Sequence, residues 1–148
     1  MLTTPNWKLL DLPIIKEPRG NLTFVEGCGR HLPFDIKRMY YLYDIPTDAE
    51  RGAHGHKKLQ QLILAISGSF EILLDNGSVK EVFHLRKPWQ GLYIQEGTWR
   101  EIRNFSAGAV CVVLASDYYD EEDYLRDYDS FLNFVGSKKA CENAEMIS

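Results

Sequence analysis

Two histidines one residue apart are the clearest candidates for chemistry in this chain. They lie in the segment Arg51–Lys58, which reads RGAHGHKK. Alternate residues of a β-strand point to the same face, so His54 and His56 would project side by side. Paired imidazoles can bind a metal ion or transfer protons, because histidine titrates near pH ~6.5. If the alternation continues, Gln60 and Leu62 share that face, which would place both histidines inside the fold.

The segments around the histidines read as short strands separated by turns. Runs rich in β-branched and aromatic residues are punctuated by turn residues, and Asp75-Asn76-Gly77 is a strong hairpin signal because Asn and Gly tolerate positive φ. This pattern predicts an all-β fold, a sandwich or barrel of antiparallel strands such as a jelly-roll barrel. The predicted strands, besides the histidine strand, comprise residues 7–12, 21–26, 35–44, 59–67, 69–75, 79–85, 91–96, 99–105 and 109–116.

The C-terminal segment has a different period. Aromatic residues between Tyr124 and Phe134 recur every three to four positions, which predicts a short helix. The acidic run 120–123 would be its solvated start, and Gly136 with the lysines after it would be its stop. We therefore expect one domain over the whole chain, residues 1–148, with a core at about 7–135 and a flexible tail at 136–148.

Composition and charge narrow the class of protein. Seventeen Lys and Arg against twenty-one Asp and Glu give a net charge of -4, which argues against a nucleic-acid partner. Three scattered cysteines indicate no disulfide framework, and Cys111 is expected to be a small buried hydrophobe. No apolar run approaches the ~20 residues needed to span a bilayer, and the N-terminus carries no signal pattern. We expect a cytoplasmic protein without a membrane partner.

The spacing His54-x-His56-x-x-x-Gln60 resembles the first motif of the cupin superfamily, and residues 91–104, GLYIQEGTWREIRN, resemble the second. Metal-binding cupins carry His, His, Glu and His at the matching positions, where this chain has His54, His56, Gln60 and Arg100. An arginine does not ligate a metal at neutral pH, and two histidines alone are a poor ligand set. We therefore expect no metal, and acid/base chemistry on an anionic intermediate instead.

A closer resemblance covers nearly all of residues 10–135. The chain resembles the nucleotide-sugar 3,4-ketoisomerases, which act on dTDP-4-keto-6-deoxyglucose on the way to 3-amino sugars of surface polysaccharides. The resemblance implies a cupin that works without metal or cofactor, generally as a homodimer. The matching segments are 19–22, 32–45, 51–77, 91–106 and 113–131, and they include RGxHxHKK and ASDYYDExDYxRxYDxF.

The ketoisomerase reaction assigns roles to the residues of the two motifs. Moving a ketone from C4 to C3 requires taking a proton from C3, passing through an enediol(ate) and returning a proton to C4. We expect His56 to be the principal base, His54 to be a second acid/base or oxygen-stabilising group, and Arg100 to hold the enediolate oxygens. Arg103 falls on the face opposite Arg100 and is expected to meet solvent.

A dTDP-sugar also needs cations for its pyrophosphate and polar groups for its sugar, since arginine forks onto phosphate oxygens. Tyr40 shares the alternation of Arg38 and could supply a phenol. The expected substrate-binding residues are Arg19, Arg38, Tyr40, Arg51, Lys57 and Gln60.

Other functions stay open at this point. A dTDP-sugar 3,5-epimerase also uses a histidine base, but it returns the proton to the carbon that lost it. A metal-dependent cupin dioxygenase would require a transition metal, and a non-catalytic sugar- or nucleotide-binding cupin would bind dTDP without exchanging sugar protons. The configuration at C4 of the product, galacto or gluco, is also left open.

Overall fold

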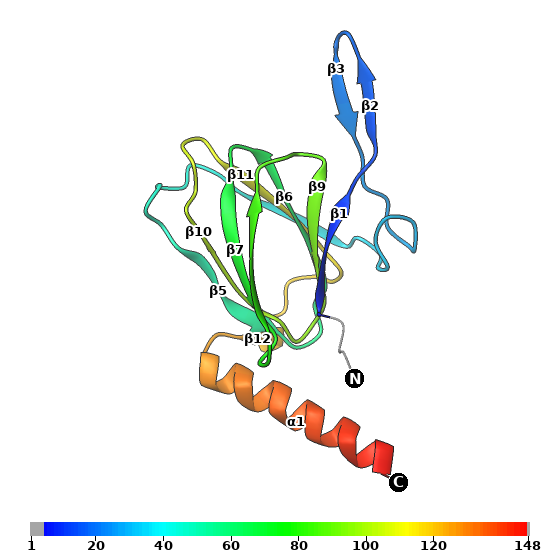
Figure 1. The fold of residues 1–148 in the computed structure, drawn as a ribbon, viewed down its shortest axis with the longest axis vertical. Helices are drawn as coiled ribbons and strands as arrows, with labels where there is room; N and C mark the ends of the chain where they lie inside the picture. The colour runs from blue at the N-terminus through cyan, green and yellow to red at the C-terminus, as the bar shows by residue number, and fades with distance from the viewer. Residues whose placement is uncertain (1–4, 148) are drawn as a thin grey trace.

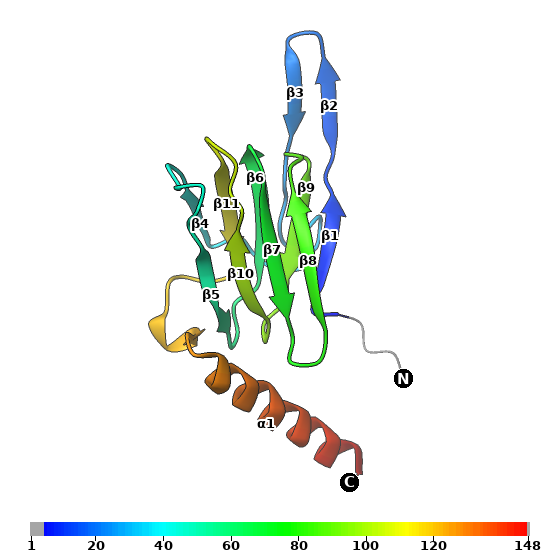
Figure 2. The same ribbon diagram turned by 60° about the vertical axis from the view of Figure 1, so that its left-hand side comes forward.

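The computed structural model describes residues 5–147, which form two facing antiparallel sheets, a separate hairpin and one long helix (Figures 1 and 2). The predicted all-β architecture with a C-terminal helix is confirmed. The strands are β1 Trp7–Asp11, β2 Ile14–Glu17, β3 Gly20–Thr23, β4 Arg38–Leu42, β5 Arg51–His56, β6 Gln61–Ser67, β7 Phe70–Asp75, β8 Lys80–Leu85, β9 Gln90–Ile94, β10 Trp99–Arg103, β11 Val110–Ala115 and β12 Tyr124–Leu125. One five-stranded sheet has the order β1-β9-β6-β11-β4 and the other β12-β5-β10-β7-β8.

The main core lies between the two sheets, where alternate residues of facing strands meet. β6 contributes Ile63 and Ala65 and β7 contributes Ile72 and Leu74, all at most 1% exposed. Each such aliphatic side chain larger than alanine stabilises the fold by about 1.5–3 kcal/mol when fully buried. Cys111 lies in the same core, as expected, and burial raises the pKa of its thiol to about 12.

The strand alternation breaks between β5 and β6, which corrects one prediction. Residues 57–60 are not in a strand; they form the turn that carries the chain from one sheet to the other. The period-two count from His54 therefore does not continue through them. Leu62 and Leu64 pack outside the barrel against Phe34, whereas Ile63 faces the core. The expectation that Leu62 shares the face of the histidines is wrong.

The hairpin β2–β3 projects away from the two sheets (Figures 1 and 2). The predicted strand at 21–26 is shorter, since β3 ends at Thr23, and β2 was not predicted. β2 and β3 pair only with each other in the described structure. Ile15 and Leu22 are more than half exposed, so this hairpin presents apolar surface to its surroundings.

The C-terminal helix α1, Tyr128–Ile147, packs against one end of the barrel (Figure 1). Phe131 is fully buried and Val135 nearly so, next to Trp99 and Leu125. The predicted helix stop at Gly136 is wrong, because α1 continues to the last residue the structure describes; Ser148 lies outside that part. No helix within residues 5–147 is long and apolar enough to cross a membrane.

The segment before α1 also differs from the prediction. The acidic run is not the start of the helix, because Glu121–Asp123 form a separate 3-10 turn and Tyr124 belongs to β12. Asp120 caps this turn by accepting a hydrogen bond from the Glu122 amide. β12 then pairs with β5, placing Tyr124 opposite His56. The segment is thereby fixed beside the histidine strand.

Candidate active site

A cavity of about 380 Å³ opens between the two sheets. Both sheets contribute to its wall: β4, β6 and β11 from one side, β5, β10 and β12 from the other. Four arginines and a histidine bring positive charge and acid/base capacity to this space, although the chain as a whole carries a net charge of -4. The polar wall residues are Arg38, Tyr40, Arg51, His54, Gln61, Arg100, Tyr124 and Arg126.

Gly55 sets the direction in which the two histidines point. A Cβ atom at Gly55 would lie 3.0 Å from the ring of Phe131, so this position of β5 faces helix α1. Its neighbours His54 and His56 therefore face the opposite way, into the barrel, as predicted. Their ring centroids are 4.8 Å apart, with the ring planes 88° to each other. His54 lies on the cavity wall, whereas His56 is fully buried behind it.

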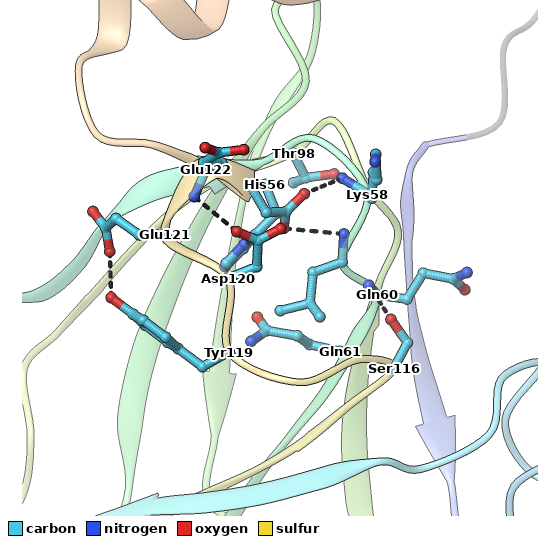
Figure 3. A network of polar contacts seen from close by, with 12 residues as sticks. His56, Lys58, Gln60, Gln61, Thr98, Ser116, Tyr119, Asp120, Glu121 and Glu122 are labelled. Carbon is cyan, nitrogen blue, oxygen red and sulfur yellow. Dashed lines mark hydrogen bonds and ion pairs between the residues drawn. The ribbon is translucent and has the colours of Figure 1, made fainter.

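His56 makes a hydrogen bond that the sequence did not suggest. Its Nδ1 lies 2.9 Å from Asp123 Oδ2, and the carboxylate also accepts hydrogen bonds from the backbone amides of Lys58 and Leu59. Figure 3 shows His56 and Lys58 close to each other, beside Asp120 and Glu122 of the acidic run. The one sequence signal for Asp123 was its place in an acidic run, which reads as solvated surface.

Arg100 is 2% exposed and lies at the centre of a second polar cluster. One guanidinium nitrogen donates to Gln61 Oε1 and the other to the Thr98 carbonyl, at 3.2 Å, while Gln61 Nε2 donates to the Tyr40 hydroxyl at 3.0 Å. Among the side chains of residues 5–144, no carboxylate lies within 4.0 Å of this guanidinium. A buried cation without a counter-ion is costly, so the site favours an anion beside Arg100.

Burial and charge hold both histidines neutral. Burial, followed by the nearby Arg100 cation, lowers the pKa of His54 to about 3. The pKa of His56 is lowered for the same two reasons and by His54. The contact of His56 with Asp123 is therefore a hydrogen bond from a neutral ring rather than an ion pair. Both imidazoles are available as bases at neutral pH, and an anion bound beside Arg100 would raise their pKa values.

Three of the residues predicted to bind substrate line the cavity, and three do not. Arg38, Tyr40 and Arg51 are in its wall. The other three are located elsewhere: Lys57 is exposed on the turn after β5, Gln60 accepts a hydrogen bond from Tyr93, and Arg19 is 86% exposed at the tip of the β2–β3 hairpin, paired with Glu17.

The position expected for Gln60 is taken by Gln61. The turn at residues 57–60 shifts the alternation by one, so the amide that meets Arg100 and Tyr40 belongs to the next residue. The backbone N–H of Gln60 donates to Ser116 Oγ at 2.9 Å (Figure 3), and its side-chain oxygen accepts from Tyr93. Arg103 lies on the outer face with Glu71 3.7 Å away, as its alternation with Arg100 predicted.

Sequence reasoning missed Arg126 and Tyr124 as parts of the cavity wall. The Arg126 guanidinium is fixed by two bonds to Glu121, at 2.6 and 2.9 Å, and lies 4.2 Å over the Tyr124 ring. Tyr124 in turn lies 4.5 Å from the His56 ring, measured between centroids. Both residues enter the site through the pairing of β12 with β5, which a two-residue strand does not reveal in the sequence.

The polar groups around the cavity do not fit a divalent cation. Among the side chains that the structure describes, residues 5–144, no three His, Cys, Asp or Glu cluster as metal ligands. The groups beside His54 and His56 are an amide and a permanent cation, Gln61 and Arg100, and the cation would repel a metal ion.

An antiparallel barrel with a cavity of histidines and arginines is a cupin-type enzyme architecture. The chain belongs to the family described as FdtA: WxcM-like, C-terminal, whose model matches residues 5–136. A TDP-4-oxo-6-deoxy-alpha-D-glucose-3,4-oxoisomerase from Aneurinibacillus thermoaerophilus is 41% identical over 128 residues, which are 86% of this chain and 91% of that protein.

Solved structures of 3,4-ketoisomerases also superimpose on this chain. A 3,4-ketoisomerase from Helicobacter canadensis superimposes with a TM-score of 0.86 at 44% identity, covering 90% of this chain and 99% of its own. A mutant of the 3,4-ketoisomerase QdtA from Thermoanaerobacterium thermosaccharolyticum, in complex with TDP-4-keto-6-deoxyglucose, gives a TM-score of 0.87 at 39% identity, covering 91% of this chain and 97% of its own. The chain spans nearly the whole length of both.

Proposed function

We propose that the protein is a sugar-nucleotide 3,4-ketoisomerase that converts TDP-4-keto-6-deoxyglucose to its 3-keto isomer. The names of its relatives support the substrate, and one feature of this chain supports the chemistry. Arg100 is buried and has no carboxylate partner among the described side chains, and it lies in the same cavity wall as the neutral base His54. A base and a desolvated cation sharing one cavity suit removal of a proton next to a ketone, since the cation stabilises the oxyanion that forms.

The proposed reaction begins at C3. His54 takes the C3 proton, the electron pair forms the C3–C4 double bond, and the C4 carbonyl oxygen becomes an enediolate oxygen beside Arg100. The O3 hydroxyl proton then passes to the O4 oxyanion, and the protonated His54 delivers its proton to C4. This leaves a ketone at C3, a hydroxyl at C4 and a neutral His54. Burial raises the pKa of Tyr40, so its phenol stays protonated and can donate to a sugar oxygen.

The roles that we propose for the two histidines are exchanged relative to the expectation from the sequence. We assign the proton transfer to His54 because it lines the cavity, and a supporting role to His56 because it is fully buried behind it. For the pyrophosphate, Arg38, Arg51 and Arg126 are the proposed contacts, since all three line the same cavity. Lys57 and Gln60 are not part of this proposal.

Incubation with TDP-4-keto-6-deoxyglucose in D₂O tests the function directly. We expect proton NMR to show a carbonyl moved to C3 and deuterium incorporated at C4. A carbonyl retained at C4 with exchange at neighbouring carbons would indicate an epimerase. Tight TDP binding without any exchange would indicate a binding protein, and a stoichiometric transition metal together with oxygen consumption would indicate a dioxygenase.

We also propose that the protein forms a homodimer through apolar surface that this chain leaves exposed. Met39 and Tyr41 on β4, Ile66 on β6, and Ile15 and Leu22 on the projecting hairpin are all between 48% and 59% exposed. An apolar second cavity of about 380 Å³ lies at the base of the same hairpin. Such a surface is unusual for a monomer.

A dimer would also give Arg19 a role that one chain alone does not provide. Arg19 is at the hairpin tip, so it is the predicted pyrophosphate contact that we assign to a partner's site. Light scattering should give twice the chain mass for the wild type and a single chain mass for Leu22→Lys; a monomeric wild type would overturn the assignment. The cytoplasmic location stays a prediction from the sequence.

A further inference from the structure

Asp123, the last residue of the acidic run 120–123, binds His56 and the turn that follows it at residues 57–60. Its carboxylate accepts from Lys58 N at 2.7 Å and Leu59 N at 3.3 Å and lies 2.9 Å from His56 Nδ1, and its own carbonyl accepts from Lys57 N at 3.0 Å. The Asp123 side chain is only 10% exposed. An aspartate with this many contacts is held rigidly and is not a solvated surface charge.

The chemistry of this contact fixes the tautomer of His56. An ionised carboxylate can only accept hydrogen bonds, so the shared proton is on His56 Nδ1. A neutral ring protonated at Nδ1 carries its lone pair on Nε2. His56 Nε2 is buried and has no hydrogen-bond partner within the described residues, on the interior side of β5 where the ring of His54 lies.

We propose that Asp123 is a positioning residue that holds His56 as the Nδ1–H tautomer, with the basic Nε2 directed into the barrel next to His54. This role rests on the proposed isomerase function, in which His54 transfers the proton and His56 supports the His54 ring. The carboxylate also fixes the ring in place, because the same group ties down the turn that follows His56.

An Asp123→Asn substitution is designed to change the tautomer of His56 while the conformation of the loop is kept. The amide oxygen is expected to stay on the Lys58 amide, the shorter of the two backbone bonds at 2.7 Å. The NH₂ group then faces His56 Nδ1 and donates to it, which moves the ring proton to Nε2. Asp120→Asn is the matched control, because Asp120 lies in the same loop and only caps its turn, a role in which asparagine serves equally well.

The experiment combines NMR of protein labelled with ¹⁵N in its histidine rings with measurements of steady-state kinetics and of TDP affinity. We expect His56 to be Nδ1–H in the wild type and Asp120→Asn, and Nε2–H in Asp123→Asn. We expect kcat of Asp123→Asn to fall by about 10²–10⁴-fold, because His56 then directs an N–H group instead of a lone pair toward the His54 base, with TDP affinity unchanged. Asp120→Asn should keep the wild-type rate.

The possible results separate a positioning role from a merely structural one. A wild-type His56 protonated at Nε2 would overturn the proposal, and so would a slow Asp123→Asn whose tautomer is unchanged, or an equal loss in Asp120→Asn. If Asp123→Asn does not fold, the wild-type spectrum still decides the tautomer. If the wild type does not turn over the keto-sugar, the proposed function fails, whereas the tautomer assignment can still hold.

Discussion

Replacing His54 with asparagine should reduce kcat by about 10²–10⁴-fold, the usual contribution of a general base, while the affinity for TDP stays close to that of the wild type. His54 is the histidine on the cavity wall, and burial and Arg100 keep its pKa low enough for it to be neutral at pH 7. Asparagine keeps much of the shape and polarity but cannot accept the C3 proton. The binding residues proposed for the pyrophosphate are untouched.

The measurement is the rate of conversion of TDP-4-keto-6-deoxyglucose, with TDP affinity by calorimetry. His84→Asn is a matched control, because His84 is exposed on β8, a strand that contributes nothing to the cavity wall. His56→Asn should also be slow, because His56 supports the reacting ring. A near-wild-type rate in His54→Asn together with an inactive His56→Asn would return the base role to His56, the order expected from the sequence.

Replacing Arg100 with methionine should lower kcat by about 10²–10³-fold, the typical loss when one oxyanion-stabilising group is removed. The same change should also alter the pH profile. Arg100 is the second cause, after burial, of the lowered pKa of His54, so without the cation this pKa rises from about 3 toward 6.5. A base is lost as it becomes protonated, so the acidic limb of the rate profile should move to higher pH.

The pH dependence of kcat/KM in Arg100→Met checks both effects at once. Arg103→Met is the control, because Arg103 lies on the outer face of the same strand next to Glu71. Arg100→Lys keeps the charge but not the paired bonds to Gln61 and the Thr98 carbonyl, so it should keep the pH profile and lose part of the rate. An unchanged acidic limb in Arg100→Met would contradict the assigned effect on His54.

Most of the fold could be predicted from local pattern, because the apolar strands and the Asn76-Gly77 turn carry their own signals. Two kinds of element could not. β2 has only four residues, half of them charged, and β12 has only two, so their pairing depends on contacts distant in sequence. Helix α1 passes Gly136 because one glycine costs only about 1 kcal/mol relative to alanine, and good helix formers follow it.

The site residues that lie within one regular strand could be predicted from the sequence. Those whose position depends on a turn or on a distant segment could not. His54 on β5 and Arg100 on β10 are direct partners in the pairing of these two strands. Period-two alternation places both side chains inside the barrel. The count failed at Gln60, because a turn of four residues intervenes, so the interior amide is Gln61. Asp123 reaches His56 across 67 positions of sequence, a contact that no local pattern of charges predicts.

The close approach of helix α1 to Gly55 means that the active histidines are supported from outside the barrel. The ring of Phe131 packs against the backbone of β5 at Gly55, the residue between the two histidines, where a Cβ atom would lie 3.0 Å from the ring. The position of both imidazoles inside the barrel is thus supported by an aromatic ring that does not line the cavity. A related chain could carry both histidines and every arginine, yet a differently seated helix would give it a different reaction geometry.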